Sequence, residues 1–310
     1  MRWVTYRSST DTLDHVALLI GDELHALPAS VTMIDVLSAA NGEATAYSRR
    51  AQDRPFERVA FESADLRPPI PEPPSIRDFM AFENHVVDSM AAMGLTVDPV
   101  WYQQPVFYFT NPAAVIGPND PNPIAPGSTQ WDYELEVAAI IGTGGRDLHP
   151  DTAEEHIAGY TILCDWSARD LQAAEMRVGL GPAKGKDTAT TIGPMVVTRE
   201  ELEPFRKGNG YDLGMRVSVN GRPYSEGSWK DQYWSFGELL AYASRGTELR
   251  SGDIIGSGTV GTGCILELSR VHDSETYPWL RPGDEVLVEV DQLGAIASTV
   301  VDGPPVVPLR

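Results

Sequence analysis

The chain has 310 residues, 42% hydrophobic and 22% charged, a length sufficient for one large domain and a small one. Its formal net charge of −20 argues against nucleic acid or anionic membrane as partners, because both would repel it. No run approaches ~18 apolar residues, and the N-terminus lacks a signal-peptide core. The only cysteines, Cys164 and Cys264, have no metal-type spacing, so a reducing, cytoplasmic setting is expected. Both lie in apolar runs and are interpreted as packing residues.

Residues 1–66 are predicted to form a small N-terminal α/β domain. Alternating patterns predict strands at residues 3–7, 15–20 and 23–27, with a hairpin turn between the last two. A short helix is expected at residues 31–40, closed by Asn41-Gly42. Five prolines between residues 66 and 74 then indicate a stiff linker, which places a larger catalytic domain at residues 67–310.

A helix is predicted to start near Ser75, because apolar residues recur at helical spacing as far as Val86. Asp78 and His85, seven residues apart, would then lie on one face of this helix, two turns from each other. A lone histidine on such a helix is more often a packed or surface residue than a catalyst, so the spacing alone assigns no role to His85.

The rest of the chain has mainly strand and turn patterns. Helices are expected at residues 151–159 and 234–245, and tail strands at residues 253–258, 263–268 and 284–290. Many strands with few helices, and no regular βαβ alternation, predict a mixed, β-rich α+β fold and argue against a doubly wound sheet.

Residues 256–261 spell G-x-G-x-x-G, the spacing of a dinucleotide-binding loop. Such a loop needs a helix directly after it, whose N-terminus holds the pyrophosphate. Because Cys264 to Leu268 has a strand-like pattern, we expect no dinucleotide site here.

Three carboxylates give the clearest chemical signal. The alternation of residues 131–138 predicts a strand, and Glu134 and Glu136 would project from one face of it. A second, buried strand is expected at residues 161–165, ending at Asp165. Carboxylates this close repel unless a cation or a proton lies between them, and an all-oxygen set suits Mg²⁺, Mn²⁺ or Ca²⁺ rather than Zn²⁺.

The phrases around these acids resemble the fumarylacetoacetate hydrolase family, from about residue 71 to about residue 303. The resemblance rests, in chain order, on Asp132-Tyr133-Glu134-Leu135-Glu136, Asp165-Trp166-Ser167-Ala168-Arg169-Asp170-Leu171-Gln172, Leu180-Gly181-Pro182 followed by Lys186 and Thr190-Thr191, and Gly256-Ser257-Gly258-Thr259. It implies a β-sandwich or roll built around a metal, usually in a homodimer. It also implies an enzyme that acts on a small 2-oxo or 1,3-dicarbonyl acid.

The resemblance implies roles for two residues near the predicted helix. Asp78 matches a metal-side aspartate, which only some branches of the family use as a ligand, and His85 matches the catalytic histidine. A histidine base needs an orienting acid. Asp88, three residues along, resembles the partner in the acylpyruvate-hydrolase branch, whereas Glu267 resembles the partner in fumarylacetoacetate hydrolase itself. Glu267 is slightly favoured, because an unpaired carboxylate in its apolar run would be costly.

Positive and amide side chains complete the implied site. Lys186 resembles the family's ammonium, which would neutralise an oxyanion or a substrate carboxylate. Arg169 and Gln172 match positions that serve the same pocket. Arg169 could instead simply pair with Asp165 or Asp170, an ordinary structural role.

Substrate contacts are implied less strongly than the chemistry. Thr259 resembles a contact to the substrate carboxylate, and Tyr108 matches a substrate-side tyrosine, although Tyr108 fits a core aromatic equally well. Met80 stands where fumarylacetoacetate hydrolase has a second substrate tyrosine. The position of that enzyme's substrate-binding arginine corresponds to about Gly94 in this chain. We therefore expect the family's chemistry with a different substrate.

The predicted activity is divalent-metal-dependent hydrolysis of a carbon–carbon bond in an acylpyruvate-like or fumarylacetoacetate-like acid. One alternative keeps the site and changes the reaction to that of a hydratase, decarboxylase or isomerase of a 2-oxo acid. A remote alternative is a non-catalytic metal- or ligand-binding protein. Residues 75–93 are expected to act as a lid that brings His85 to the metal, with a permanently docked helix as the competing interpretation.

Overall fold

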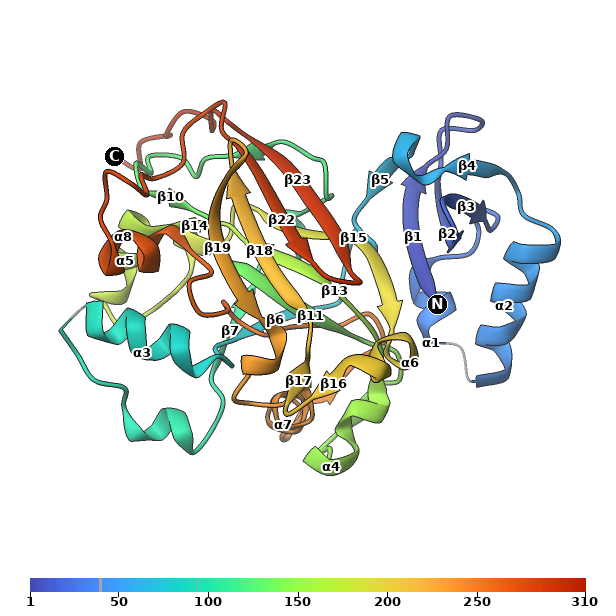
Figure 1. The fold of residues 1–310 in the computed structure, drawn as a ribbon, viewed down its shortest axis with the longest axis horizontal. Helices are drawn as coiled ribbons and strands as arrows, with labels where there is room; N and C mark the ends of the chain where they lie inside the picture. Colours follow the sequence, from blue (N-terminus) through green and yellow to red (C-terminus); the bar gives the residue numbers. More distant parts are fainter. Residues whose placement is uncertain (39–40, 93) are drawn as a thin grey trace.

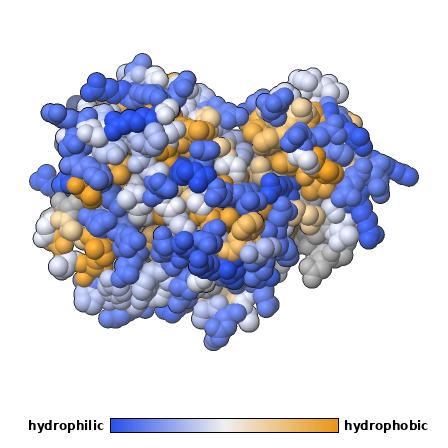
Figure 2. Space-filling view, viewed as in Figure 1, coloured by the Kyte–Doolittle hydropathy of each residue, from blue (hydrophilic) through white to orange (hydrophobic). Residues whose placement is uncertain are grey.

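The computed structural model describes residues 1–38, 41–92 and 94–310. Within these ranges a large sheet packs against a smaller one, with helices at the outer faces and ends (Figure 1). This arrangement confirms the predicted mixed, β-rich α+β fold. No helix of the described ranges is both long and apolar enough to cross a membrane. The face drawn in Figure 2 is mostly hydrophilic, with its apolar residues in several separate groups.

The larger sheet has the strand order β4-β3-β2-β1-β15-β13-β11-β21-β6-β7 in the part of the chain described, with β5 on β1 and β8 on β15. Its strands are β1 (Arg2–Arg7), β2 (Asp14–Ile20), β3 (Glu23–Ala26), β4 (Arg58–Ala60), β5 (Asp65–Arg67), β6 (Ile76–Phe79), β7 (Phe107–Thr110), β8 (Val115–Ile116), β11 (Leu135–Ile141), β13 (Ile157–Asp165), β15 (Thr190–Thr198) and β21 (Ile254–Gly256).

The smaller sheet has the order β19-β18-β22-β23-β9. Its strands are β9 (Asn122–Pro123), β18 (Gly214–Val219), β19 (Arg222–Ser228), β22 (Glu285–Val290) and β23 (Gly294–Val301). Three two-stranded ladders join β10 (Trp131–Asp132) to β14 (Ser167–Ala168), β12 (Gly145–Arg146) to β20 (Glu248–Leu249), and β16 (Arg206–Lys207) to β17 (Gly210–Tyr211). The described α-helices are α1 (Met33–Ser38), α2 (Asn41–Asp53), α3 (Glu83–Ala92), α4 (Pro150–Ala153), α5 (Arg169–Met176), α6 (Arg199–Leu202), α7 (Phe236–Ala243) and α8 (Ile265–Val271).

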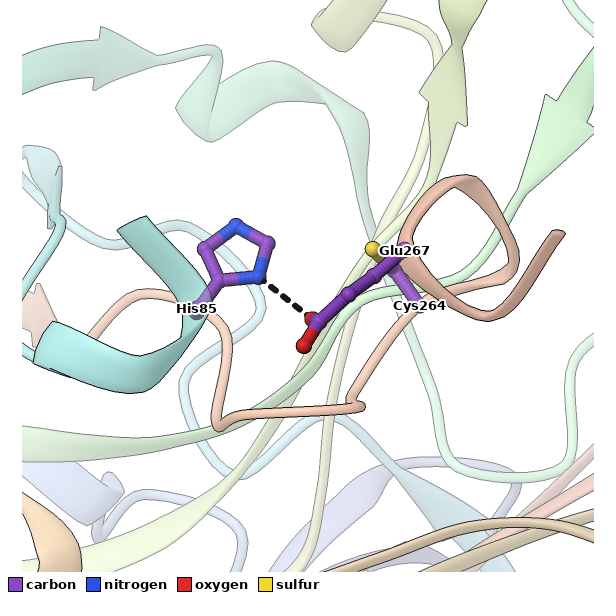
Figure 3. Close-up of side chains that lie close together, drawn as sticks. All are labelled: His85, Cys264 and Glu267. Atoms are coloured by element: carbon purple, nitrogen blue, oxygen red, sulfur yellow. Dashed lines mark hydrogen bonds and ion pairs between the residues drawn. The ribbon is translucent and has the colours of Figure 1, made fainter. Parts of the chain in front are cut away.

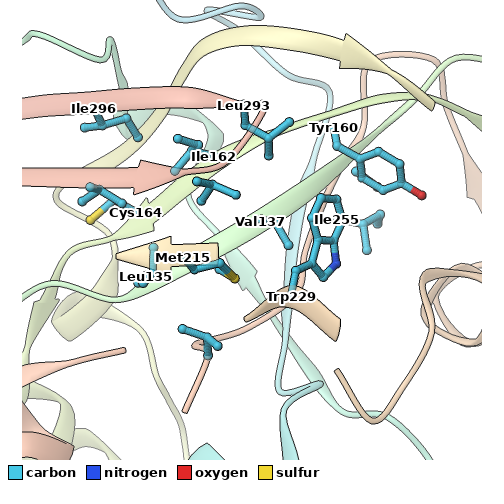
Figure 4. Packing of buried hydrophobic residues seen from close by; sticks show 14 of the residues in the cluster. Leu135, Val137, Tyr160, Ile162, Cys164, Met215, Trp229, Ile255, Leu293 and Ile296 are labelled. Atoms are coloured by element: carbon cyan, nitrogen blue, oxygen red, sulfur yellow. The ribbon is translucent and has the colours of Figure 1, made fainter. Parts of the chain in front are cut away.

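The main core lies between the two sheets. Strands β11 and β13 contribute Leu135, Val137 and Ile162 from the large sheet, and these side chains pack with Met215 and Ile296 of the smaller one (Figure 4). Alternate residues of the same strands, such as Ala138 and Ile140, belong to a second core on the opposite face, together with residues of β1, β2 and α1. Strand β11 is therefore buried on both faces, which explains its nearly continuous apolar sequence.

The N-terminal strands continue the large sheet, because β1 pairs with β15 as well as with β2 and β5. The predicted strands at residues 3–7, 15–20 and 23–27 are confirmed as β1, β2 and β3. The division of the chain into domains at residue 66 stays a prediction.

The helix predicted from residue 31 is present as α1, and the end of that prediction, residues 39–40, lies outside the described residues. Asn41-Gly42 was wrongly predicted to close a helix, because the second helix, α2, begins at Asn41. The predicted helix at residues 151–159 is also too long. Its α-helical part, α4, ends at Ala153, and β13 begins at Ile157.

Two further sequence predictions near the site are wrong. Residues 76–79 form strand β6 instead of the start of a helix, because β6 pairs with β21 on one side and β7 on the other. Asp78 and His85 are therefore not two turns apart on one helix, and a lid cannot include β6. Residue 93, the last of the proposed lid, lies outside the described residues.

The strand predicted at residues 263–268 is instead helix α8, so Glu267 lies on a helix. The reason is long-range: the Asp132 carboxylate accepts hydrogen bonds from the backbone N–H groups of Ile265 and Leu266. The strand that argued against a dinucleotide site after Gly256 is therefore absent, because these residues form a helix. In the structure the helix does follow the glycine-rich loop, but the side chain of Asp132 already occupies its first N–H groups.

Candidate active site

Four carboxylates meet at one end of the large sheet. Oxygens of Asp78, Glu134, Glu136 and Asp165 all lie within 4.8 Å of one another, and all four residues are buried. The sequence prediction that Glu134 and Glu136 lie together near Asp165 is thus confirmed, and Asp78 joins them from β6.

The strand registers explain why these acids converge. In the second core, Ile76, Ala138 and Leu163 share one face of the sheet. Two residues away on the same strands, and so on the same face, lie Asp78 on β6, Glu136 on β11 and Asp165 on β13. Glu136 pairs with Leu163, while Gly256 pairs with both Ala138 and Asp78. On this face of the sheet, the apolar residues of the second core are therefore followed directly by the carboxylate cluster.

Gly256 leaves the space that the cluster needs. A Cβ at this position would stand 2.3 Å from Oδ1 of Asp78 and 3.3 Å from Oε2 of Glu136. Any larger residue would displace the two carboxylates. The next glycine, Gly258, donates its N–H to both, at 3.2 Å to Asp78 and 3.1 Å to Glu136. The glycine-rich turn thus supports the acids.

Burial and mutual repulsion change the proton affinity of this cluster. Burial, followed by the charge of Asp165, raises the pKa of Asp78 from 3.8 to about 7. Burial raises the pKa of Asp165 to about 6 even though Lys186 acts in the opposite direction. The pKa of Glu136 is raised well above its ordinary value by burial and then by Asp78. Without a cation, Asp78, Glu136 and Asp165 therefore bind a proton more tightly than free carboxyl groups do.

Two cations balance Glu134. Burial opposes ionisation of this carboxyl, but Lys186 first and Arg169 second hold the pKa of Glu134 well below its ordinary value. The Lys186 ammonium donates to Glu134 and to Oδ2 of Asp165, the latter at 2.6 Å. Arg169 lies 2.7 Å from Glu134 and donates from Nε to Asp132 at 2.8 Å. Arg169 therefore does form ion pairs, but with Asp132 and Glu134 instead of the predicted partners Asp165 or Asp170.

A histidine–glutamate pair lies beside the cluster. His85 on α3 and Glu267 on α8 point toward each other, and Nδ1 of His85 lies 2.9 Å from Oε2 of Glu267 (Figure 3). The second oxygen of Glu267 accepts the N–H of Thr262 at 2.7 Å. Glu267, not Asp88, is the carboxylate that His85 contacts. His85 is near enough to Glu134 to contribute to lowering the pKa of that carboxyl.

The thiol of Cys264 also lies close to this pair (Figure 3). Burial raises the pKa of Cys264 well above its ordinary value, so the thiolate is disfavoured. This agrees with the prediction that Cys264 is a packing residue.

The remaining predicted residues surround the acids. Tyr108 donates its hydroxyl to Oδ2 of Asp165 at 2.6 Å, which makes it a neighbour of the cluster. Thr259 donates to Glu136 at 3.5 Å. Gln172 accepts a hydrogen bond from Arg169 at 3.2 Å. All of them therefore lie within one hydrogen bond of a cluster carboxylate or of its arginine.

The donor set fits a hard divalent cation. It consists only of carboxylate oxygens, and Oδ1 of Asp165 is buried with no hydrogen-bond partner among the described residues. A cation held by Asp78, Glu134, Glu136 and Asp165 together would give that oxygen a partner and relieve the repulsion within the cluster.

Asp132 is a residue of the site to which the sequence analysis gave no role. It is fully buried and contacts both Arg169 and the start of α8. The signal was present in the sequence, because Asp132, Glu134 and Glu136 continue one period of two. A strand pattern alone does not show that a third acid faces a helix that is distant along the chain.

The chain is similar in sequence to known proteins. Residues 75–301 match the family model described as the C-terminal domain of fumarylacetoacetate (FAA) hydrolase. Fumarylacetoacetase of Oryza sativa is 33% identical, with 62% of this chain and 57% of the rice protein covered. An oxaloacetate tautomerase of Bacillus subtilis is 31% identical, covering 78% of this chain and 74% of that protein. The chain thus spans little more than half the length of the rice relative.

Solved structures show the same fold. A probable 2-hydroxyhepta-2,4-diene-1,7-dioate isomerase from Mycobacterium abscessus has a TM-score of 0.74 at 25% identity, covering 98% of this chain and 100% of the other. Maleylpyruvate hydrolase from Sphingobium sp. SYK-6, in complex with manganese(II) ion and pyruvate, has a TM-score of 0.73 at 22% identity, with coverage of 98% and 100%. The second likeness concerns the fold alone.

Proposed function

Because the chain belongs to the fumarylacetoacetate hydrolase family, we propose that it is a divalent-metal-dependent hydrolase of a 1,3-dicarbonyl acid such as an acylpyruvate. One observation carries this proposal: a buried cluster of four carboxylates lies beside a hydrogen-bonded His85–Glu267 pair. The first element can hold a cation, and the second has the arrangement of a general base with its orienting acid.

Asp78, Glu134, Glu136 and Asp165 would hold Mg²⁺ or Mn²⁺. When bound, the cation would supply Lewis-acid polarisation of the substrate's oxygens. Lys186 would place its ammonium where negative charge develops on the attacked carbonyl oxygen. The homodimer that the family resemblance implies stays a prediction.

His85 would act as the base. Because a carboxylate only accepts hydrogen bonds, Glu267 would hold the proton of the neutral ring at Nδ1 and leave Nε2 free to accept one. Nε2 would take a proton from a water molecule whose oxygen attacks the acyl carbonyl carbon. The bond from that carbon to the methylene then breaks, its electron pair leaves with the 2-oxo acid as an enolate, and a proton returns to the methylene carbon. The products are a carboxylic acid and a 2-oxo acid such as pyruvate.

A second candidate is an isomerase or tautomerase of a 2-oxo acid. The Bacillus subtilis relative, an oxaloacetate tautomerase, favours it, because that reaction needs the same polarised enol and a base but no attacking water. Hydratase and decarboxylase chemistry remain further alternatives at the same site, and a non-catalytic binding protein is the least supported, because both His85 and Lys186 are present.

The proposal is tested by treating the purified protein with a chelator and assaying acylpyruvates before and after adding Mg²⁺ or Mn²⁺. We expect release of pyruvate and a carboxylic acid, its loss with the chelator, and its return with either metal. Full hydrolytic activity in the metal-free protein would contradict the proposal. Conversion of oxaloacetate between its keto and enol forms, with no acylpyruvate cleaved, would favour the tautomerase.

A further inference from the structure

Asp132 connects the metal side and the base side of the site. It is the last residue of β10 and is 0% exposed. Its Oδ1 accepts the N–H of Ile265 at 2.7 Å, and its Oδ2 accepts the N–H of Leu266 at 3.0 Å and Nε of Arg169 at 2.8 Å. Three donors from two helices thus converge on one carboxylate.

One arm leads from Asp132 to the acid cluster. Arg169, held at Nε by Asp132, places Nη2 2.7 Å from Oε1 of Glu134. Its Nη1 donates to Gln172 at 3.2 Å. Since Asp132 shares the positive charge of Arg169, Glu134 keeps more of its negative charge for a cation. Asp132 thereby affects a candidate metal ligand that it does not touch.

The other arm leads to the base. Ile265 and Leu266 are the first two residues of α8, and Glu267 follows them directly. The backbone just before α8 is fixed as well, because Cys264 forms a backbone bridge with Glu134. Asp132 therefore sets where α8 begins, and with it the position of the carboxylate that contacts Nδ1 of His85.

An amide cannot replace this carboxylate. Asparagine offers one acceptor oxygen and one NH₂ group, so at least one of the three donors would face another donor. A buried donor without an acceptor costs more than a lost surface hydrogen bond, so the helix start or Arg169 would shift. The geometry therefore requires a negatively charged group with two acceptor oxygens.

We propose that Asp132 is a positioning residue that holds Arg169 beside Glu134 and Glu267 beside His85 at the same time. The inference rests on the proposed function, since it assigns Asp132 to the same metal and the same base. It predicts that one substitution at Asp132 changes both the Mn²⁺ affinity and the tautomer of His85, although Asp132 contacts neither the candidate metal ligands nor His85.

The experiment compares Asp132→Asn with wild type in two assays. Manganese binding is measured by calorimetry, and the tautomer of His85 in the metal-free protein is measured by ¹⁵N NMR with labelled histidine, assigned against His85→Ala. In Asp132→Asn we expect the Mn²⁺ dissociation constant to rise about tenfold or more and kcat to fall roughly 10- to 100-fold, the range for residues that support metal ligands. The His85 signal should move from the Nδ1–H form toward a mixture of tautomers.

Two variants serve as controls. Glu267→Gln should change the His85 tautomer but leave Mn²⁺ affinity close to that of wild type, because Glu267 contacts His85 and none of the four clustered carboxylates. Asp253→Asn is the matched control, since Asp253 is also buried, lies 3.6 Å from Arg77 and accepts a backbone N–H from Arg250. It should change neither quantity.

The outcomes separate the two proposals. If wild type binds no Mn²⁺ and cleaves no acylpyruvate, the proposed function fails. If wild type does both but Asp132→Asn matches Asp253→Asn in both assays, the positioning role is overturned. Should Asp132→Asn not fold, the same quantities are measured in Asp132→Glu, whose extra methylene displaces the acceptors. The inference then requires both to change and is overturned if neither does.

Discussion

The buried acid cluster should make the metal-free protein less stable as the pH rises. Asp78 has an ordinary pKa near 3.8 that burial, and next Asp165, raise to about 7 in the folded protein. The folded state therefore keeps a proton at pH 5 that the unfolded chain has lost. This stabilisation is complete below about pH 4 and disappears as the pH rises through about 7.

The magnitude follows from that difference. Each tenfold difference in proton affinity is equivalent to ~1.4 kcal/mol. Between pH 5 and pH 7 the folded state loses this stabilisation at Asp78 by about one such factor of ten per pH unit, and little remains at pH 8. We expect the free energy of unfolding without metal to fall by about 3 kcal/mol over this range. The raised pKa of Asp165, about 6, acts in the same direction.

Urea unfolding in the presence of a chelator, at pH 5, 6, 7 and 8, measures this directly. Asp78→Asn cannot titrate at this position, so its curve should be flatter than that of wild type by about the same amount. Asp302→Asn, which removes an exposed carboxylate, should follow wild type. Added Mn²⁺ should stabilise wild type more at pH 8 than at pH 5, because the cation replaces the protons. A wild-type curve that parallels Asp78→Asn would refute the reasoning.

Four further outcomes are expected. Glu136→Gln should stay folded, judged by circular dichroism, but lose Mn²⁺ binding in calorimetry, because one of the clustered carboxylates is gone. His85→Ala should keep its Mn²⁺ affinity while hydrolysis falls roughly 10²- to 10⁴-fold, the scale of a general base; near-native turnover would place the base elsewhere. Tyr108→Phe removes the hydroxyl that donates to Asp165 and should weaken Mn²⁺ binding about tenfold, with an unchanged melting temperature. If α3 is a lid, its amides should exchange fast in the free enzyme and slowly with metal and oxalate, whereas equal protection in both states indicates a docked helix.

The fold class and three acids of the cluster, Glu134, Glu136 and Asp165, could be predicted because they depend on local patterns. Alternation along β11 placed Glu134 and Glu136 on one side of the strand, and the apolar run before Asp165 marked the end of β13. These features need only the period of two and the position of a polar residue at the end of a buried strand. That these acids meet Asp78 depends instead on long-range pairing, of β11 with β13 and of β21 with β6.

The elements around His85 could not be predicted in the same way. Residues 76–79 become β6 because strands distant in sequence supply hydrogen bonds on both sides. Residues 265–271 become α8 because Asp132, more than a hundred residues earlier, accepts their first N–H groups. In both cases tertiary hydrogen bonds decided between two locally acceptable conformations. The choice of Glu267 over Asp88 as the partner of His85 depends on the same contacts.

Incubating the metal-loaded enzyme with an acylpyruvate in H₂¹⁸O tests the central claim most directly. The account predicts that the carboxylic acid product carries one ¹⁸O from the attacking water, while pyruvate appears in equal amount, both measured by mass spectrometry. His85→Ala under the same conditions should release little of either product. Unchanged acylpyruvate, or a product that is only rearranged, decarboxylated or hydrated with its carbon–carbon bond to the acyl group intact, would contradict the account.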